Sequence, residues 1–272
     1  MGKAKLEKAL QEKIHSNQKI FSPFIMAGDG GLDVLEERIN FLQACGAGAI
    51  ELGIPFSDPV ADGPTIQAAG IRALENGTNL TRVLEILQAG KDTRSIPIVI
   101  MTYLNPVIAY GMERFAEACQ HAGVDGVIIP DLSMEEEPII ASALEANDIA
   151  FVRLAAMTSP KERLLELAKR SEGFLYAVAV NGTTGARANH DLQVSSYLQA
   201  LKEYSNVPVL AGFGVSNSEQ ARVLGEHCDG VIVGSKIVEL LHAGETEEIR
   251  KLIGGSVLSW KRLEQKAHMD FP

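Results

Sequence analysis

A carboxylate lies inside one of the apolar segments of the sequence. Glu51 belongs to the run Ala-Ile-Glu-Leu-Gly (49–53), and on an extended strand it shares a face with small residues. Burying a carboxylate there is costly unless it is paired or used in chemistry. Burial would raise its pKa toward neutrality, which suits a general acid–base. The alternative is a structural glutamate bonded to the backbone or to an arginine.

A second acid, Asp62, follows in a loop at residues 55–64, Pro-Phe-Ser-Asp-Pro-Val-Ala-Asp-Gly-Pro. Asp62 precedes a glycine, so it could equally be a turn residue. If it lies at the same rim as Glu51, the two acids can divide acid–base and cation-stabilising roles. Asp58 precedes Pro59 and is expected to make turn contacts.

Glycine-containing turns follow the last two apolar segments, as Gly212-Phe213-Gly214 and Gly234-Ser235. Glycines let backbone N–H groups approach a phosphate, and the dipole of a following helix favours the anion. The loop at 181–189, Asn-Gly-Thr-Thr-Gly-Ala-Arg-Ala-Asn, adds glycines and hydroxyls, and its length and composition suggest a mobile lid. These turns favour a phosphate site, although ordinary strand-to-helix turns can have the same composition.

Eight apolar segments rich in Val and Ile are expected to be strands. Most are continuous rather than alternating, as in parallel strands buried on both faces. They are residues 23–27, 49–54, 96–103, 126–130, 149–155, 174–180, 207–213 and 230–234.

The segments between them have the apolar spacing of helices. Apolar residues at helical spacing among Lys and Glu also predict an extra helix at the N-terminus. The stretch 65–90 is longer than one helix needs, so we expect two helices broken near Gly77. The other expected helices are residues 32–44, 112–121, 138–146, 160–170, 194–204 and 216–226, the last with Ser216 and Glu219 as a capping box.

Strands alternating with helices imply right-handed βαβ units and a parallel sheet. Eight units in 272 residues predict an α/β fold, a single-domain (β/α)8 TIM barrel over residues 1–272 with an extra N-terminal helix. The rival is an open doubly wound sheet, but the glycines after the first strand lack the G-x-G-x-x-G spacing that commonly marks it. In a barrel, the active site lies at the carboxyl ends of the strands, and phosphate often binds after strands seven and eight.

The composition excludes several classes of protein. The chain has 25 Lys and Arg against 35 Asp and Glu, a net charge of −10, which argues against nucleic-acid binding. No apolar run approaches the ~18 residues of a membrane span, and the N-terminus lacks the apolar core of a signal peptide. The three cysteines lack metal or redox spacing, so we expect reduced thiols in a cytoplasmic protein.

At these residues the sequence resembles the tryptophan synthase α-subunit family over essentially its whole length. The run at 51–64, Glu-Leu-Gly-Ile-Pro-Phe-Ser-Asp-Pro-Val-Ala-Asp-Gly-Pro, resembles the family signature almost word for word. Further motifs fall in the family's order: Met-Thr-Tyr-Leu-Asn-Pro (101–106), Pro-Asp-Leu (130–132), Thr-Gly-Ala (184–186), Gly-Phe-Gly-Val (212–215) and Gly-Ser (234–235). In register, these motifs are far more specific together than any one alone.

The resemblance implies retro-aldol cleavage of indole-3-glycerol phosphate to indole and glyceraldehyde 3-phosphate. Glu51 matches the family's acid–base glutamate, and Asp62 matches the aspartate that stabilises positive charge at the indole nitrogen. Phosphate-binding positions match Gly185, Gly214, Gly234 and Ser235. Positions around the indole and the phosphate match Phe24, Ile66, Tyr103, Ile128, Tyr176, Thr184 and Phe213. For the apolar ones, such as Phe24 and Ile128, a place in the barrel core is the commoner role.

The resemblance also implies a partner. Family members form an α2β2 complex in which the β subunit carries pyridoxal phosphate and receives indole through a tunnel, whereas the α subunit uses no metal or organic cofactor. The lid of the family corresponds to residues 182–193, and the departures at Asn181-Gly182 and Leu104 bear only on partner affinity and loop dynamics. The expected partner interface comprises Pro55, Asp58, Pro59, Asn105 and Asp131.

Other interpretations stay open. A stand-alone indole-3-glycerol phosphate lyase would have nearly the same sequence. A non-catalytic barrel subunit would have lost one of the acids, and both are present. Another phosphate-binding barrel is less favoured, because a Schiff-base aldolase needs a lysine inside a strand and no expected strand contains one.

Overall fold

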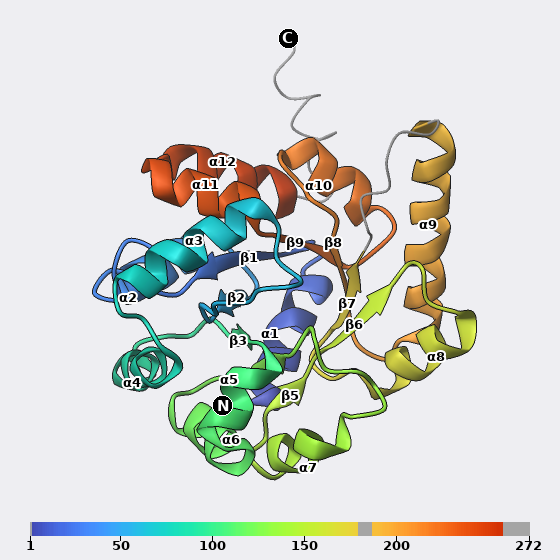
Figure 1. The fold of residues 1–272 in the computed structure, drawn as a ribbon. Coiled ribbons are helices and arrows are strands. Elements are labelled where there is room, and N and C mark those ends of the chain that lie inside the picture. Colours follow the sequence, from blue (N-terminus) through green and yellow to red (C-terminus); the bar gives the residue numbers. More distant parts are fainter. Residues whose placement is uncertain (1, 179–186, 258–272) are drawn as a thin grey trace.

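The computed structural model describes residues 2–178 and 187–257 (Figure 1). Within these ranges, parallel strands form one sheet in the order β5-β4-β3-β2-β1-β9-β8-β7-β6, with helices around it. The strands are β1 (Ile20–Met26), β2 (Ile50–Gly53), β3 (Ile98–Met101), β4 (Gly126–Ile128), β5 (Ala150–Phe151), β6 (Arg153–Ala156), β7 (Leu175–Val178), β8 (Val209–Gly212) and β9 (Gly230–Val233).

The sheet curls into a nearly closed barrel with one interruption. β1 pairs with both β2 and β9. On the opposite side, β5 pairs with β4 and β6 pairs with β7, so the interruption lies between β5 and β6, the two ends of the sheet order. The predicted strand at 149–155 is therefore divided at Val152, because the N–H of Arg153 donates to Ser171 Oγ (3.2 Å) instead of continuing the ladder with β4. The predicted (β/α)8 architecture is confirmed, and the single unbroken fifth strand was wrong.

Helices cover the outside of the barrel, so every residue of β1, β2 and β9 is buried. No helix in the described ranges is long and apolar enough to cross a membrane. The helices are α1 (Lys3–His15), α2 (Leu35–Ala44), α3 (Pro64–Glu75), α4 (Leu80–Gly90), α5 (Leu104–Tyr110), α6 (Met112–His121), α7 (Pro138–Ala146), α8 (Lys161–Arg170), α9 (Arg187–Tyr204), α10 (Ser218–Gly225), α11 (Ser235–Ala243) and α12 (Thr246–Val257).

Helix α1 closes the amino-terminal end of the barrel. Its Leu6 and Leu10 are fully buried and pack with residues of the barrel interior, including Phe174. The buried carboxylate of Asp125 accepts the N–H of Gly2 (2.9 Å) and so fixes the start of the helix. With this end filled, the carboxyl ends of the strands are the end at which a site can form.

The connection after β2 leads directly into the first helix behind it. Gly63 precedes α3 and Pro64 is its first residue, a position where proline loses no hydrogen bond. α3 ends before Gly77, which has a positive φ of 72°, and Asn79 caps α4 by accepting the N–H of Arg82 (3.1 Å). The predicted break near Gly77 is confirmed, and α3 begins two residues after Asp62.

The cap of α10 differs from the expected one. Asn217, not Ser216, caps this helix, and its side chain accepts the N–H of Gln220 (2.9 Å). Ser216 instead donates its own N–H to the Gln220 side chain (2.9 Å). The predicted capping box of Ser216 and Glu219 was wrong, because Asn217, an equally good cap type one residue later, takes the N-cap position.

Leu10→Ala should lower the free energy of unfolding by about 2–5 kcal/mol, because it leaves a cavity among fully buried side chains. Urea denaturation followed by circular dichroism measures the change. Val223→Ala, at a side chain that is half exposed on α10, serves as the control and should stay within about 0.5 kcal/mol of the wild type. Equal effects of the two changes would contradict the role of α1 as a plug.

Candidate active site

Glu51 lies on β2, in register with Phe24 of β1 and Val99 of β3. The side chain is only 1% exposed, and neither carboxylate oxygen has a hydrogen-bond partner among the described residues. Burial, and secondly the neighbouring charge of Asp62, raise the pKa of Glu51 to about 8. A structural glutamate would be bonded to the backbone or to an arginine, so the unpaired carboxyl favours the chemical interpretation.

Asp62 is half-buried in the loop between β2 and α3. Its backbone forms a turn, since its N–H donates to the carbonyl of Pro59 (3.1 Å) and its carbonyl accepts from the side chain of Gln67 (2.8 Å). Its carboxyl is left for the site, where burial raises its pKa to about 6 and a hydrogen bond from Tyr103 opposes that rise. The expected turn is therefore the role of the Asp62 backbone, and the catalytic role of its side chain stays a prediction.

The two carboxyl groups have different protonation states at neutral pH. With a pKa of about 8, Glu51 is mostly protonated at pH 7, whereas Asp62 with a pKa of about 6 is mostly ionised. The two groups are close enough that the charge of Asp62 raises the pKa of Glu51 and the charges of both raise the pKa of Tyr176 on β7. A protonated carboxyl and an ionised one thus lie close to each other, an arrangement that could divide acid–base and cation-stabilising roles.

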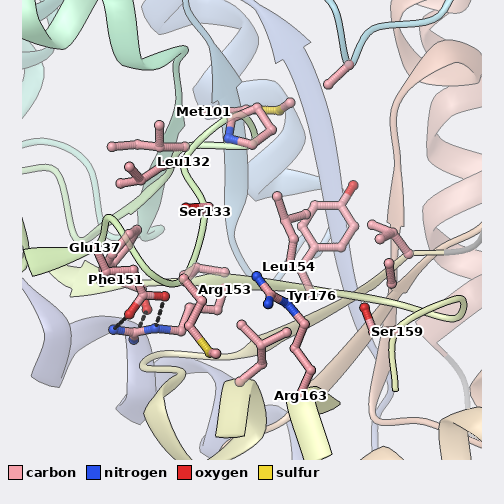
Figure 2. A pocket seen from close by; sticks show the side chains of 18 residues that line it. Met101, Leu132, Ser133, Glu137, Phe151, Arg153, Leu154, Ser159, Arg163 and Tyr176 are labelled. Carbon is pink, nitrogen blue, oxygen red and sulfur yellow. Dashed lines mark hydrogen bonds and ion pairs between the residues drawn. The ribbon is translucent and has the colours of Figure 1, made fainter. Parts of the chain in front are cut away.

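A cavity of about 470 Å³ opens between the ends of β3 and β4 and those of β6 and β7, and its lining includes Ala61, the residue before Asp62 (Figure 2). Its wall includes the predicted Tyr176 and the side chains of Met101, Pro130 and Leu154, which sequence reasoning missed. Met101 is two positions before Tyr103, so strand alternation could have placed both on one face. No local sequence pattern predicted that Leu154 lines the cavity, because its side chain reaches the cavity beside the interruption between β5 and β6.

The outer end of this cavity is ionic. Arg153 of β6 holds Glu137 through two hydrogen bonds (2.9 and 3.0 Å), drawn as dashed lines in Figure 2. Arg163 of α8 likewise holds Glu135 through two (2.7 and 2.9 Å). These ion pairs join β6 and α8 to the segment before α7, across the side of the barrel where β4 and β6 are not paired. The inner end of the cavity is apolar.

Other predicted side chains lie in several places. Phe24 and Ile66 lie next to Gly234. A Cβ atom added to this glycine would be 3.6 Å from Cβ of Phe24 and 3.8 Å from Cδ1 of Ile66. Ile128 is fully buried in the barrel interior, as a core residue would be. The Phe213 ring packs against Tyr197 of α9, with centroids 6.4 Å apart.

Two of the predicted phosphate-binding turns are placed as expected at the carboxyl end of the barrel. Gly214 follows β8 with a positive φ of 64°, and Gly234 caps α11, whose first residue is the exposed Ser235. The N-terminus of α11 thus directs free backbone N–H groups toward this end. Thr184 and Gly185 lie outside the described residues, with the rest of the first part of the expected lid (residues 182–186 of 182–193).

The residues expected at the partner interface are mostly on the surface. Asp58, Asn105 and Asp131 are exposed, and Pro59 is half-buried. Pro55 is buried and lines a surface hollow of about 320 Å³ with Pro106 and Tyr110 among others. Within the described residues, no group of three His, Cys, Asp or Glu side chains is placed to hold a metal ion.

The raised pKa of Glu51 makes stability depend on pH. The native protein holds this proton up to a pKa of about 8, against 4.5 for the free group, so its contribution is complete below pH 4.5 and is lost as the pH rises through about 8. Glu51→Gln should therefore gain stability relative to the wild type between about pH 5 and 9, by on the order of 4 kcal/mol.

Urea denaturation across that pH range measures this difference. Glu75→Gln, at an exposed residue of α3, is the matched control and should follow the wild type at every pH. Parallel curves for Glu51→Gln and the wild type would show that Glu51 ionises normally.

Comparison with known proteins connects this site to a family. The family model described as tryptophan synthase alpha chain matches residues 10–267. The tryptophan synthase alpha chain of Oceanobacillus iheyensis is 59% identical over 257 residues, 94% of this chain and 98% of that one. That of Bacillus mycoides is 52% identical over 238 residues, 88% of this chain and 92% of that one.

Solved structures agree with these sequences. The crystal structure of tryptophan synthase subunit alpha from Legionella pneumophila superposes with a TM-score of 0.84 at 30% identity, covering 94% of this chain and 97% of that one. A tryptophan synthase chain from Mycobacterium tuberculosis gives a TM-score of 0.85 at 32% identity, covering 93% and 98%. With the buried Glu51 and the neighbouring Asp62 at the open end of a (β/α)8 barrel, these matches show that the chain belongs to the tryptophan synthase alpha chain family.

Proposed function

We propose that this chain cleaves indole-3-glycerol phosphate to indole and glyceraldehyde 3-phosphate, as the α subunit of a tryptophan synthase. Its family catalyses this lyase half-reaction. The observation that carries the proposal is the pair of Glu51, buried without a partner, and Asp62, whose pKa values of about 8 and 6 bracket neutrality. Retro-aldol cleavage of an indole needs one protonated and one ionised acid.

The acid–base steps assign a separate role to each carboxyl group. Glu51 in its protonated form gives a proton to indole C3, and the ring then carries positive charge at its nitrogen. Asp62, ionised, stabilises that charge electrostatically. The Glu51 carboxylate next takes the proton of the glyceryl hydroxyl as the C–C bond breaks, so indole and the aldehyde leave and the acid is restored. The low polarity around Glu51 favours its neutral form before and after turnover.

The two ends of the substrate have different surroundings in this proposal. The phosphate binds where Gly214, Gly234 and Ser235 present backbone N–H groups, together with Gly185 of the lid. The indole ring occupies the inner, apolar end of the cavity, which Tyr176 of β7 and Met101 of β3 line. We assign Phe24, Ile66 and Phe213 to the wall between the two ends, with Ile128 supporting it from the barrel core; Thr184 is assigned to the substrate from the family resemblance alone.

We further propose a β subunit partner that carries pyridoxal phosphate and takes up the indole, in an α2β2 complex in the cytoplasm. The supporting feature is the surface formed by loop 55–64 and α5, where Val60 is 83% exposed and Ile108 is 52% exposed. Large apolar side chains exposed together often mark a protein interface. This subunit itself then needs neither a metal nor an organic cofactor, because its own acids supply the proton chemistry.

Release of indole from indole-3-glycerol phosphate, measured with and without a tryptophan synthase β subunit, tests the function. Glu51→Gln should lower kcat by about 100-fold or more, because the proton donor is lost. Asp62→Asn should also lower kcat strongly, because it removes the stabilising charge. Glu75→Gln is the control and should match the wild type.

The outcomes separate the alternatives. Release that is weak alone and rises with the β subunit supports the synthase subunit. Rapid release that the β subunit does not change indicates a stand-alone lyase. No release by folded wild-type protein under either condition would refute both enzymatic functions.

Ser235→Asp should raise KM for indole-3-glycerol phosphate roughly tenfold or more, because it puts a second negative charge where the phosphate binds. Steady-state kinetics with the β subunit saturating measures KM. Ser16→Asp, an identical change at an exposed residue of the opposite end of the barrel, controls for net charge. An unchanged KM in Ser235→Asp would place the phosphate elsewhere.

A further inference from the structure

The hydroxyl of Tyr103 lies between two groups of the loop that carries Asp62. It accepts the backbone N–H of Ala61 (3.0 Å), and it lies close enough to the carboxyl group of the next residue, Asp62, to lower the pKa of that group. A phenol has one proton to donate besides its lone pairs, so it can serve both adjacent residues at once. This arrangement fixes the backbone before Asp62 and the direction of its carboxylate together.

The Tyr103 ring is itself held firmly. It is 3% exposed, and it packs against Phe56, with ring centroids 5.4 Å apart at an angle of 33°. Phe56 belongs to the same loop as Asp62, so the phenol contacts this loop near both of its ends. A side chain with two rotatable bonds and this packing has few alternative positions.

The backbone of Tyr103 is set from a third loop. Tyr103 is the residue before α5, and the next N–H, that of Leu104, donates to the carboxylate of Asp131 (2.9 Å). Asp131 follows β4, so its carboxylate supplies the cap that α5 lacks in its own sequence. A continuous series of contacts therefore runs from the exposed Asp131 through the start of α5 to Asp62.

We propose that Tyr103 is the positioning residue for Asp62, aiming its carboxylate at the indole nitrogen through its hydroxyl, and that Asp131 holds Tyr103 in place. This inference rests on the proposed function, because it assigns Asp62 its task in that reaction. Tyr103 then acts mainly through Asp62 rather than as part of the wall around the ring. Asp131 lies on the expected partner surface, so a docked partner would bear directly on this series of contacts.

The phenol also bears on the charge of Asp62. Its hydrogen bond stabilises the ionised carboxylate and lowers the pKa of Asp62 against the rise that burial causes. The other titratable groups that interact with Asp62 are Glu51 on β2 and Tyr176 on β7, and both lose their protons at higher pH than Asp62 does. The acid limb of the activity profile therefore includes the ionisation of Asp62, beside that of the substrate phosphate, which substitutions in the enzyme leave unchanged.

The test is the pH profile of kcat/KM for indole release by Tyr103→Phe, with the full chain and a saturating β subunit. Phenylalanine keeps the ring that packs on Phe56 and removes only the hydroxyl. We expect the acid limb, near pH 6 in the wild type, to move up by on the order of one pH unit. We expect kcat to fall by up to about 100-fold with KM little changed, because a misaimed charge weakens the transition state more than binding.

Tyr204→Phe, at the end of α9, removes a hydroxyl far from this loop and should leave the acid limb in place. In an Asp62→Asn background, Tyr103→Phe should have little further effect on kcat, because its target is already gone. A raised KM with an unmoved acid limb would make Tyr103 a wall residue and overturn the inference. Failure of the wild type to release indole would instead overturn the proposed function.

Asp131→Ala tests the outer part of the series, at an exposed side chain whose loss leaves the core intact. It should move the acid limb in the same direction by a smaller amount, since the phenol is loosened but kept. Combined with Tyr103→Phe, it should add no further shift. Independent, additive shifts would show that Asp131 does not act through Tyr103.

Discussion

The energetic cost of the Glu51 carboxyl determines how this site is built. A carboxylate at 1% exposure with no hydrogen-bond partner among the described residues is disfavoured, so the group keeps its proton at neutral pH. The barrel can tolerate the group only as a neutral acid. That same penalty makes it a proton donor, so the property that weakens the fold at high pH is the property the chemistry uses.

The second acid has to stay ionised a short distance away, and the loop architecture allows this. Asp62 lies at the edge of the barrel rather than inside a strand, half-exposed, with a hydroxyl donor to favour its charge. The full burial of Glu51, the partial exposure of Asp62 and the tyrosine hydroxyl together separate the two carboxyl groups by about two pKa units. The loops around Asp62 are held together by hydrogen bonds: the Asp131 carboxylate accepts the N–H of Leu104 at the start of α5, and the Tyr103 hydroxyl accepts the N–H of Ala61.

The two ends of the barrel have separate tasks. At the amino end, Leu6 and Leu10 fill the interior and Asp125 anchors the chain, so this end contributes stability. At the carboxyl end, the interruption between β5 and β6 leaves space beside Tyr176 that a continuous strand pairing would have closed. The ion pair of Arg153 and Glu137 joins the two sides of this interruption without filling its inner, apolar part.

The sequence by itself determined the repeating βαβ pattern, the bounds of helices such as α6 and α7, and the identity of the two acids. These follow from local features, because a period of apolar residues or a carboxylate in an apolar strand is visible within a few positions. Only the tertiary structure decided that Val152 interrupts a strand, that Leu154 reaches the cavity and that the Tyr103 hydroxyl binds the backbone of Ala61, next to Asp62. Those outcomes depend on which distant segments become neighbours when the barrel closes, and no local pattern records such contacts.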